Sequence, residues 1–590
     1  MQLFGFGLGT GLVGRTAVTQ KRVLRREALV GPYHAAASPA AGALAKSKPG
    51  RLVMGSAGNG TTGHLGGELF KSMAGVFLVH VPYRGSPQAI QDLMGGQVDM
   101  VFDNLSSTAP HIKSGRVKML GISGRSRSPL FPDIPDSGEV VPGYEPAAWG
   151  RVVAPGFIDV HTHDDRLLLK PARGPHPKLS QGVTTVVTGN CGISFAPLVT
   201  DSPPAPLDLL GTTGWRFERF ADYLDALEHA QPAVNAACLV GHTTLRARHM
   251  KDLNRPATPE EAQHMAADLA DALRSGAFGL STGLYYPPAR AADATEIIAV
   301  GAALTRADAV LTMHIRDEGD AITAALREAL LIGKTLGIAA VLSHHKLVGT
   351  ANHGRSVETL ALIDEAAKTQ SVCLDCYPYN ASSTMLLPER VHQSSDVWVT
   401  WSQTEPGAAG RSLFELARER QQPPEDLARA LQPAGAIYFA MDEADVSRIL
   451  AHPLSMVGSD GLAHDVRPHP RLWGTFPRVL GRYVREQRLL SLETAIHKMT
   501  GLSARRFGLQ ERGVLAVGNF ADLVIFDEHQ VADRASYEDP TQVSTGIEAV
   551  YVNGRLACER GVTLDMHAGQ VLRRQQIPSE TQSIFPKAYP

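Results

Sequence analysis

Cysteine is scarce in this chain of 590 residues, which holds five: Cys191, Cys238, Cys373, Cys376 and Cys558. An odd and widely spaced set excludes a disulfide framework and favours a reducing compartment. No apolar run approaches the length of about 20 residues that a helix needs to cross a bilayer. Near the start of the chain, the basic residues of QKRVLRRE follow the apolar stretch, which is the reverse of a secretory signal. A cytoplasmic protein is therefore expected.

A charge excess of either sign is also missing. Lys and Arg number 57 against 59 Asp and Glu, which gives a formal net charge of −2. This balance excludes the strong positive field that attracts nucleic acid or an anionic membrane, so neither is expected as a partner. Apolar residues make up 44% of the chain and charged residues 20%, which is typical of a globular protein with a large core. The composition leaves the oligomeric state open.

Residues 51–148 alternate between strand-like and helix-like patterns, whereas residues 1–50 show no sustained period and are expected to form an unstructured leader. Three runs resemble the second lobe of Bug-type solute receptors of tripartite tricarboxylate transporters: GSAGNGTTGHLGGELFK, HVPYRGSPQAIQDLMGGQVDMVFDN and RSPLFPDIPDSGE. The resemblance implies a single α/β lobe like those of periplasmic binding proteins. Such receptors bind an organic acid between two lobes, and only one is recognisable here.

From residue 150 to about 509 the chain repeats strand–helix units, which predicts a (β/α)8 TIM-like barrel, again of the α/β class. The predicted barrel strands are PGFIDVHTH, TTVVTGN, AACLVG, AFGLST, VLTMHI, AAVLSHH, SVCLDCYPY and SMVGSD. An insertion is expected near residues 386–434. Residues 510–575 are rich in strand and turn signals and predict a small β-domain, followed by a tail over 576–590.

Side chains that bind metals recur where predicted barrel strands end. His161 and His163 end the first strand, and because residues two apart in a strand point to the same side, both imidazoles should converge. Cys191 follows the second strand, and His314 and His344 end two later ones. Active sites form at this end of a barrel, so the set favours a zinc centre.

Simpler interpretations exist for these residues. An isolated HxH is compatible with exposed loop histidines, and a lone cysteine is more often a small packing residue. Asp460, which follows the last strand, fits a general base and acid above a metal but also an N-cap or an Asx turn. Cys373 and Cys376 form CxxC without a redox context and are interpreted as packing residues. Three further histidines are expected to hydrogen-bond behind the ligands or to contact substrate: His242, His345 and His464.

The region 150–575 resembles the D-aminoacylase (N-acyl-D-amino-acid deacylase) branch of the amidohydrolase superfamily. The motifs that carry the resemblance are PGFIDVHTHDD, QGVTTVVTGNCGIS, MHIRDEGD, LSHHK, LDCYPYNASSTML, PAGAIYFAMDE, GSDGLAHDVRPHPRLWGTFPRVLG and GNFADLVIFD. The resemblance implies a metal-dependent hydrolase that cleaves the amide bond of small N-acyl-D-amino acids with zinc. It further implies one tight ion at Cys191, His314 and His344, and a weaker second ion at His161 and His163 with Cys191 as a bridge.

Other residues receive roles from the same resemblance. Asp460 would be the general base and acid. Four residues would face the substrate carboxylate: Lys346, Tyr377, Ser383 and Arg471. Three would line the side-chain pocket: Tyr285, Tyr438 and Met441. A guanidinium such as that of Arg471 suits a carboxylate because it donates two parallel hydrogen bonds. Without the resemblance, Lys346 and Arg471 would be interpreted as surface charges, and Tyr377 and Tyr438 as packing residues.

Two rival functions remain open. Cyclic amidases of the hydantoinase or dihydroorotase type usually bridge two metals with a carboxylated lysine, whereas Cys191 would bridge here. A non-catalytic carboxylate-binding protein would need neither the ligand set nor Asp460.

The start of the β-domain departs from the family pattern. By resemblance, relatives carry β-strands before PGFID, and the receptor-like fragment stands in their place. The small β-domain is therefore expected to be incomplete, with unpaired edges. A fused reading frame with an intact barrel is the favoured explanation, and a genuine two-part protein is the alternative.

Overall fold

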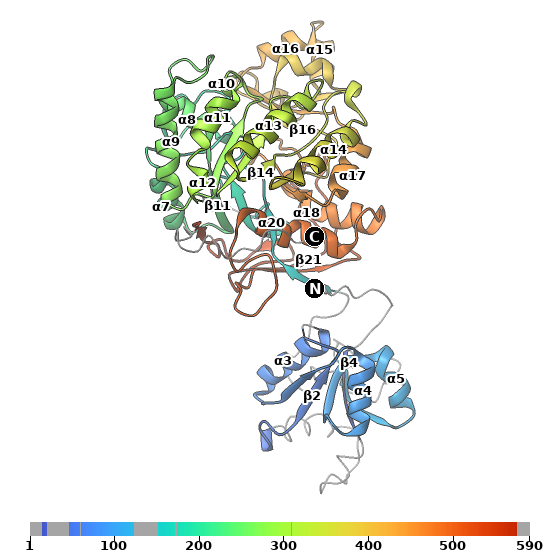
Figure 1. Cartoon of the computed structure of the whole chain (residues 1–590). Helices are drawn as coiled ribbons and strands as arrows, with labels where there is room; N and C mark the ends of the chain where they lie inside the picture. Colours follow the sequence, from blue (N-terminus) through green and yellow to red (C-terminus); the bar gives the residue numbers. More distant parts are fainter. Residues whose placement is uncertain are drawn as a thin grey trace. The chain divides into compact units, whose positions relative to one another are not determined.

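The computed structural model describes residues 14–19, 46–59, 61–122, 151–170, 174–307 and 309–574. The chain divides into two compact units, Met1–Val152 and Val153–Pro590 (Figure 1). No helix among these residues is long and apolar enough to cross a membrane.

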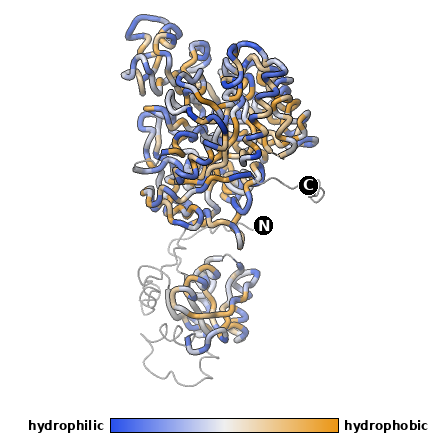
Figure 2. Tube along the Cα trace, turned by 90° about the vertical axis from the view of Figure 1, so that its left-hand side faces the viewer, coloured by the Kyte–Doolittle hydropathy of each residue, from blue (hydrophilic) through white to orange (hydrophobic). Residues whose placement is uncertain are grey.

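A five-stranded sheet with the order β3-β2-β4-β1-β5 forms the N-terminal unit. Its α3 begins after Thr61, whose hydroxyl accepts a hydrogen bond from His64 N. Apolar side chains of α3 and of the central strands pack into one core, and the apolar stretches run through the middle of this unit (Figure 2). The elements are β2 (Val53–Ser56), α3 (Thr62–Ala74), β3 (Val79–Pro82), α4 (Ser86–Gly95), β4 (Met100–Asn104), α5 (Leu105–Lys113) and β5 (Val117–Ile122).

One strand of this sheet lies where the sequence predicts no element. β1 (Gly14–Thr19) falls within residues 1–50 and pairs antiparallel with both β4 and β5. A strand of this length carries too little periodicity to be recognised by itself, and its pairing partners are distant in the sequence. The rest of the expected leader, residues 1–13 and 20–45, lies outside the described residues.

Eight parallel strands form the barrel of the second unit, which confirms the predicted fold. In spatial order they are β7 (Phe157–Asp159), β8 (Val183–Thr188), β11 (Asn235–Gly241), β12 (Gly279–Gly283), β13 (Val310–His314), β14 (Ala339–Leu342), β15 (Val372–Cys376) and β19 (Ser455–Val457). A parallel bridge between Thr162 and Gly461 brings the last strand beside the first. β8 and β11 are buried along their whole length, because the barrel interior covers one face and helices the other.

Helices surround the barrel (Figure 1). The longest, α9, begins with a capping box in which Thr258 and Glu261 each bond the other's backbone N–H. The helices are α7 (Phe220–Ala230), α8 (His242–His249), α9 (Pro259–Arg274), α10 (Pro287–Arg290), α11 (Ala294–Gly301), α12 (Leu304–Ala307), α13 (Ile322–Leu336), α14 (Ser356–Ala367), α17 (Glu443–Ala451), α18 (Arg471–Arg478), α19 (Leu492–Met499) and α20 (Gly501–Phe507). A π-helix, Val479–Glu486, continues α18.

The segment between β15 and α17 carries a small sheet with the order β16-β18-β17 and two helices. Its elements are β16 (Ser382–Met385), β17 (Val397–Ser402), α15 (Leu413–Glu419), α16 (Pro424–Ala430) and β18 (Ala434–Tyr438). The two helices pack on the sheet around a separate apolar core that includes Val399, Leu416, Leu427 and Ala436. A short hairpin, β9 (Leu198–Thr200) with β10 (Trp215–Phe217), follows β8.

The small β-domain is a five-stranded sheet in the order β23-β22-β21-β20-β6. β6 (Arg151–Pro155) supplies one edge strand, beside β20 (Leu523–Asp527), β21 (Ile547–Val552), β22 (Arg555–Glu559) and β23 (Val562–Thr563). The predicted range 510–575 differs from the structure at its end, because β24 (Val571–Leu572) pairs with barrel strand β11 instead. A segment of two residues is too short for its sequence pattern to predict which distant strand it pairs with.

His176 connects the barrel to this domain. Its backbone N–H donates to Thr563 Oγ1 at 3.0 Å. Its ring Nδ1 accepts from Lys178 N and Leu179 N at 3.2 and 3.4 Å, which requires a neutral imidazole. Burial, and then the charge of Lys178, lower the pKa of His176 to about 3.

We expect His176 to make the fold sensitive to acid. Between pH 6.5 and 3 the unfolded chain binds a proton that the folded chain does not, so this contribution is complete above pH 6.5 and is lost as the pH falls. The free energy of unfolding should be lower at pH 5 than at pH 7 by about 2 kcal/mol from this residue. His176→Asn keeps an acceptor and should flatten the dependence of Tm on pH. His529→Asn, at a side chain that is 64% exposed, is the control and should leave the slope unchanged. Equal slopes in wild type and His176→Asn would contradict the assignment.

Candidate metal centre and active site

Barrel strands carry the five predicted metal ligands to one end of the barrel. His161 and His163 follow β7, Cys191 follows β8, His314 is the last residue of β13, and His344 follows β14. All five are buried. Each of these residues lies at the end of its strand or a few residues after it, so the strand determines where the side chain lies.

Cys191 Sγ joins two groups of donor atoms. It lies 3.2 Å from His161 Nε2 and 3.2 Å from His344 Nε2, and the latter is 3.1 Å from His314 Nδ1. Within each group the donor atoms lie within 4.8 Å of one another; the groups are His161, His163, Cys191 and Asp460, and Cys191, His314 and His344. A sulfur shared by two groups has the position of a bridging ligand.

This donor set fits zinc, which binds thiolate, imidazole and carboxylate. Burial by itself would raise the pKa of the Cys191 thiol, but the imidazoles of His161 and His344 lower the pKa well below 9, toward the thiolate that binds metal. Asp375 lies beside His161 Nδ1 at 3.2 Å, which leaves Nε2 directed at the sulfur. A carboxylate behind a histidine ligand is the usual way in which its ring is oriented.

Two contacts behind the ligands were not predicted from the sequence. Asp375 also accepts from His344 N at 2.9 Å, so it contacts two of the predicted ligands. Glu318 Oε1 lies 3.2 Å from His344 Nδ1 and 2.5 Å from Lys346 Nζ. Among the predicted outer histidines, His242 pairs with Glu296 at 2.9 Å and His345 with Thr359 at 2.9 Å.

Three residues of the site have a left-handed backbone. The φ angles are 54° at Cys191, 35° at His344 and 50° at Asp460. Residues with a Cβ rarely adopt this region, which costs on the order of 1 kcal/mol each. Each of the three follows a barrel strand at the point where the chain turns its side chain toward the donor cluster.

Asp460 lies between the donor cluster and Arg471. Its Oδ1 is 3.3 Å from His163 Nε2 and 3.6 Å from His161 Nε2, and its Oδ2 is 2.9 Å from Arg471 Nη2. Burial would raise the pKa of Asp460, but the guanidinium of Arg471 and then His161 lower the pKa well below its ordinary value. The carboxylate is therefore ionised.

Arg471 and Ser383 present donors that the described residues do not use. Arg471 is fully buried and donates through Nη2 to the backbone oxygen of Ser383 at 3.0 Å. Its Nε and Nη1, and Ser383 Oγ, have no hydrogen-bond partner in the described part of the chain. Buried donors without a partner are costly, and an anion bound among them would satisfy all three. The Tyr377 ring lies 4.4 Å from this guanidinium.

The predicted pocket residues lie around these groups. Tyr285 stacks on His314 with ring centroids 5.1 Å apart. Tyr438 donates to Met385 O at 2.8 Å, and Met441 Sδ accepts from Tyr377 at 3.8 Å. The sequence did not single out Arg390, whose buried guanidinium lies 4.6 Å from the Tyr438 ring and 5.4 Å from the Tyr285 ring.

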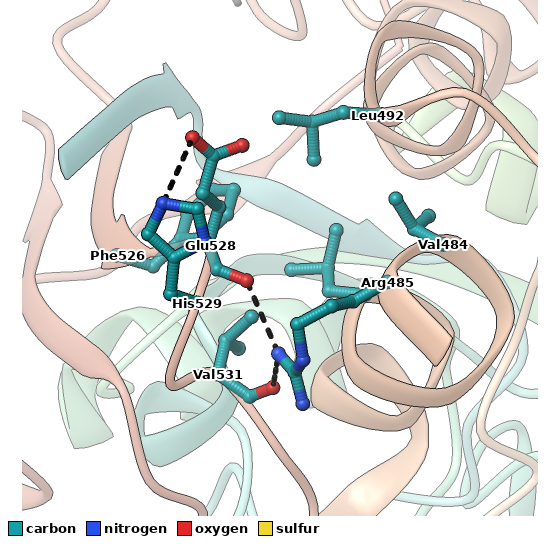
Figure 3. Close-up of a pocket in the computed structure, with 8 residues that line it drawn as sticks. Val484, Arg485, Leu492, Phe526, Glu528, His529 and Val531 are labelled. Carbon is teal, nitrogen blue, oxygen red and sulfur yellow. Dashed lines mark hydrogen bonds and ion pairs between the residues drawn. The ribbon is translucent and has the colours of Figure 1, made fainter. Parts of the chain in front are cut away.

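A separate cavity of about 170 Å³ lies at the π-helix, away from these residues (Figure 3). The lining residues come from the π-helix and α19 (Leu480, Val484, Arg485 and Leu492) and from the segment that begins in β20 (Phe526, Glu528, His529 and Val531). None of the predicted site residues lines it.

Comparison with known proteins identifies both parts of the chain. The amidohydrolase family model matches residues 147–329 and 417–557, and a D-aminoacylase of Alcaligenes xylosoxydans xylosoxydans is 57% identical over 426 residues, 72% of this chain and 88% of that protein. The chain belongs to the D-aminoacylase branch of the amidohydrolase family. This amidohydrolase superimposes on a crystal structure of a D-aminoacylase with a TM-score of 0.70 and 56% sequence identity. The match covers 72% of this chain and 90% of the D-aminoacylase chain.

Two other relatives of this amidohydrolase have names that specify acidic substrates. An N-acyl-D-aspartate deacylase from the same organism is 56% identical and covers 72% of this chain and 86% of its own. The solved N-acyl-D-glutamate deacylase of Bordetella bronchiseptica, complexed with zinc and a phosphonate inhibitor, is 48% identical with a TM-score of 0.69 over 72% of this chain and 89% of its own.

Residues 36–165 of the amidohydrolase chain, which include most of the N-terminal unit, match the tripartite tricarboxylate transporter family receptor. A relative from Pseudomonas sp. (strain P51) is 42% identical over 113 residues, and the match spans 34% of that protein. Both resemblances drawn from the sequence are thereby confirmed.

Proposed function

We propose that this chain is a zinc-dependent N-acyl-D-amino-acid deacylase, which yields a carboxylate and a free D-amino acid. The observation that supports this most directly is the convergence of Cys191, three or more imidazoles and Asp460 at one end of the barrel. The relatives named above act, by their names, on N-acyl-D-amino acids. The spacing of the cysteines supports a cytoplasmic location.

One zinc ion would be held tightly by Cys191, His314 and His344, and a second more weakly by His161 and His163. Bound zinc supplies Lewis acidity toward water and toward the acyl carbonyl. The sharing of Cys191 by both donor groups supports a bridging thiolate. Lys346 lies beside His344, but its Nζ is engaged by Glu318, which argues against the cyclic-amidase alternative.

Asp460 would take the proton from water and return it to the leaving nitrogen. Its two oxygens favour this role, since one faces the histidine ligands and the other is held by Arg471. Arg471 would bind the substrate carboxylate through the donors that are unused in the structure, together with Ser383 Oγ. Lys346 and Tyr377, which lie beside them, would add contacts to the same carboxylate.

A panel of N-acetyl D- and L-amino acids, assayed with and without added zinc, tests the function. We expect hydrolysis of D-enantiomers only, dependent on zinc. Hydrolysis of hydantoins in place of acyl amino acids would indicate the cyclic amidase. A metal-free protein that binds a dicarboxylate without turnover would indicate the binding protein.

Arg390 supports a preference for acidic side chains. Its guanidinium is buried beside Tyr285 and Tyr438, and no carboxylate in the described part of the chain pairs with it; its hydrogen bond is to Ser382 Oγ at 3.4 Å. A buried cation without an anionic partner is favourable only if a ligand supplies the anion. The side chain of D-aspartate or D-glutamate would do so.

Arg390→Leu should lower kcat/KM for N-acetyl-D-glutamate or N-acetyl-D-aspartate by about 100-fold, because a buried ion pair with substrate is lost. The value for N-acetyl-D-methionine should change little. Arg390→Lys, which keeps the charge, serves as the matched variant and should retain part of the acidic preference. Equal losses on all three substrates would assign Arg390 to packing instead.

A further inference from the structure

Asp460 has an unfavourable backbone that the surrounding structure must hold in place. Its φ is 50°, and its N–H donates to His161 O at 2.8 Å. A residue with this φ relaxes to an ordinary conformation unless its neighbours are fixed. The groups that hold Ser459 and Gly461 therefore decide where the Asp460 carboxylate lies.

Asp159, at the end of β7, holds the residue before Asp460. Its Oδ1 accepts from Ser459 N at 2.8 Å and from His161 N at 3.4 Å. The same carboxylate thus fixes the first histidine of the HxH motif and the turn that carries Asp460. Asp159 is fully buried, so a cation must balance its charge.

Lys178 supplies that cation. Its Nζ donates to Asp159 Oδ2 at 2.8 Å and to Ser459 Oγ at 2.8 Å, and it lies 3.4 Å from Asp164 Oδ2. Ser459 Oγ in turn accepts from Gly461 N at 3.3 Å. One ammonium, fully buried, is therefore tied to the chain on both sides of Asp460.

We propose that Lys178 is a positioning residue for Asp460: through Ser459 and Asp159 it holds the left-handed turn that directs the Asp460 carboxylate between the histidine ligands and Arg471. The inference rests on the proposed function, because it assumes that Asp460 transfers the proton. In the described part of the chain, Lys178 Nζ pairs with Asp159, Ser459 and Asp164, and with neither the donor atoms of the cluster nor Arg471.

The test uses two changes of different severity in the full chain. Lys178→Met removes the ammonium and leaves two buried carboxylates unpaired, so it also destabilises the fold. Ser459→Ala removes only the hydroxyl that links Lys178 to the turn and keeps the Lys178–Asp159 pair. We expect kcat to fall about 100-fold in Lys178→Met and about tenfold in Ser459→Ala, as for residues that orient a reactive group. KM and the content of the ion assigned to Cys191, His314 and His344 should be nearly unchanged.

Strand β19, which leads into the turn at Asp460, offers controls at its start. Lys498 is a second buried lysine whose Nζ donates to Ser455 O at 3.1 Å, at the start of β19. Lys498→Met removes a buried ammonium that is not tied to the turn at Asp460, and Ser455→Ala removes a buried hydroxyl, 3.3 Å from Cys376 Sγ, while the bond of Lys498 to the backbone oxygen stays in place. They should lower Tm and leave kcat unchanged at a temperature well below every Tm.

Kinetics of Asp460→Asn, measured in parallel, separates this inference from the proposed function. If Ser459→Ala and Lys178→Met keep wild-type kcat while Asp460→Asn is inactive, Lys178 does not position Asp460. If the control variants lose kcat as much as their partners, the role of Lys178 is structural and the inference also fails. If Asp460→Asn is active, the proposed function fails first. Should Lys178→Met not fold, the comparison of Ser459→Ala with Ser455→Ala decides.

Discussion

Asp460→Asn should lower kcat by about 1000-fold, the loss that follows when a general base and acid is removed. Asparagine has the same shape and keeps hydrogen-bonding atoms near His163 and Arg471, but its amide cannot take a proton. The ion assigned to Cys191, His314 and His344 should stay bound, since Asp460 belongs to the other donor group. Steady-state kinetics and metal analysis by mass spectrometry measure the two effects separately.

Asp465→Asn is a matched control from the same loop. Asp465 is buried, and burial raises its pKa to about 7, so near neutral pH a neutral amide resembles its protonated form. We expect kcat within about threefold of wild type, as for a substitution outside the reacting groups. Comparable losses in both variants, or full activity in Asp460→Asn, would refute the assignment of Asp460.

Cys191→Ala should remove the metal together with the activity. The thiolate is shared by both donor groups, so its loss weakens every position at once. One ligand of a structural zinc site accounts for roughly a quarter of 10–16 kcal/mol, which corresponds to about 100- to 1000-fold weaker binding. Zinc content after dialysis against a chelator, and activity at saturating zinc, measure the change.

Cys238→Ala removes a buried thiol from the neighbouring strand β11 and is the control. Burial raises the pKa of Cys238 well above its ordinary value, so this thiol is not poised to bind metal. Cys238→Ala should keep wild-type zinc content. A Cys191→Ala protein that retains its zinc and activity would show that the sulfur is a packing residue.

The eight barrel strands, and the convergence of metal-binding types of side chain at their ends, could be predicted because a buried parallel strand is a short apolar run that stops abruptly. His314 and Cys191 are conspicuous for this reason: each is a polar or reactive side chain placed directly after such a run. The same logic identified Asp460 after SMVGS.

The residues behind the ligands could not be predicted in the same way. Asp375 stands between Cys373 and Cys376, and the sequence analysis considered only the two cysteines of this CxxC pattern. A carboxylate inside a buried strand needs a partner, and this alone indicates a role for Asp375. Glu318 lies in a loop among other acidic residues, and only the fold reveals which of them faces inward. Arg390 and Lys178 come from irregular segments without a period, so their burial depends on tertiary packing.

The left-handed residues of the site carry a consequence for evolution in the laboratory. A glycine at 191, 344 or 460 would adopt the same φ without the steric cost of a Cβ, which is about 1 kcal/mol at each position. Selection for heat resistance alone would not protect these groups in full, because relief of the backbone strain offsets part of the stability that their side chains contribute. A screen for more heat-resistant variants of this enzyme therefore has to score turnover in every round.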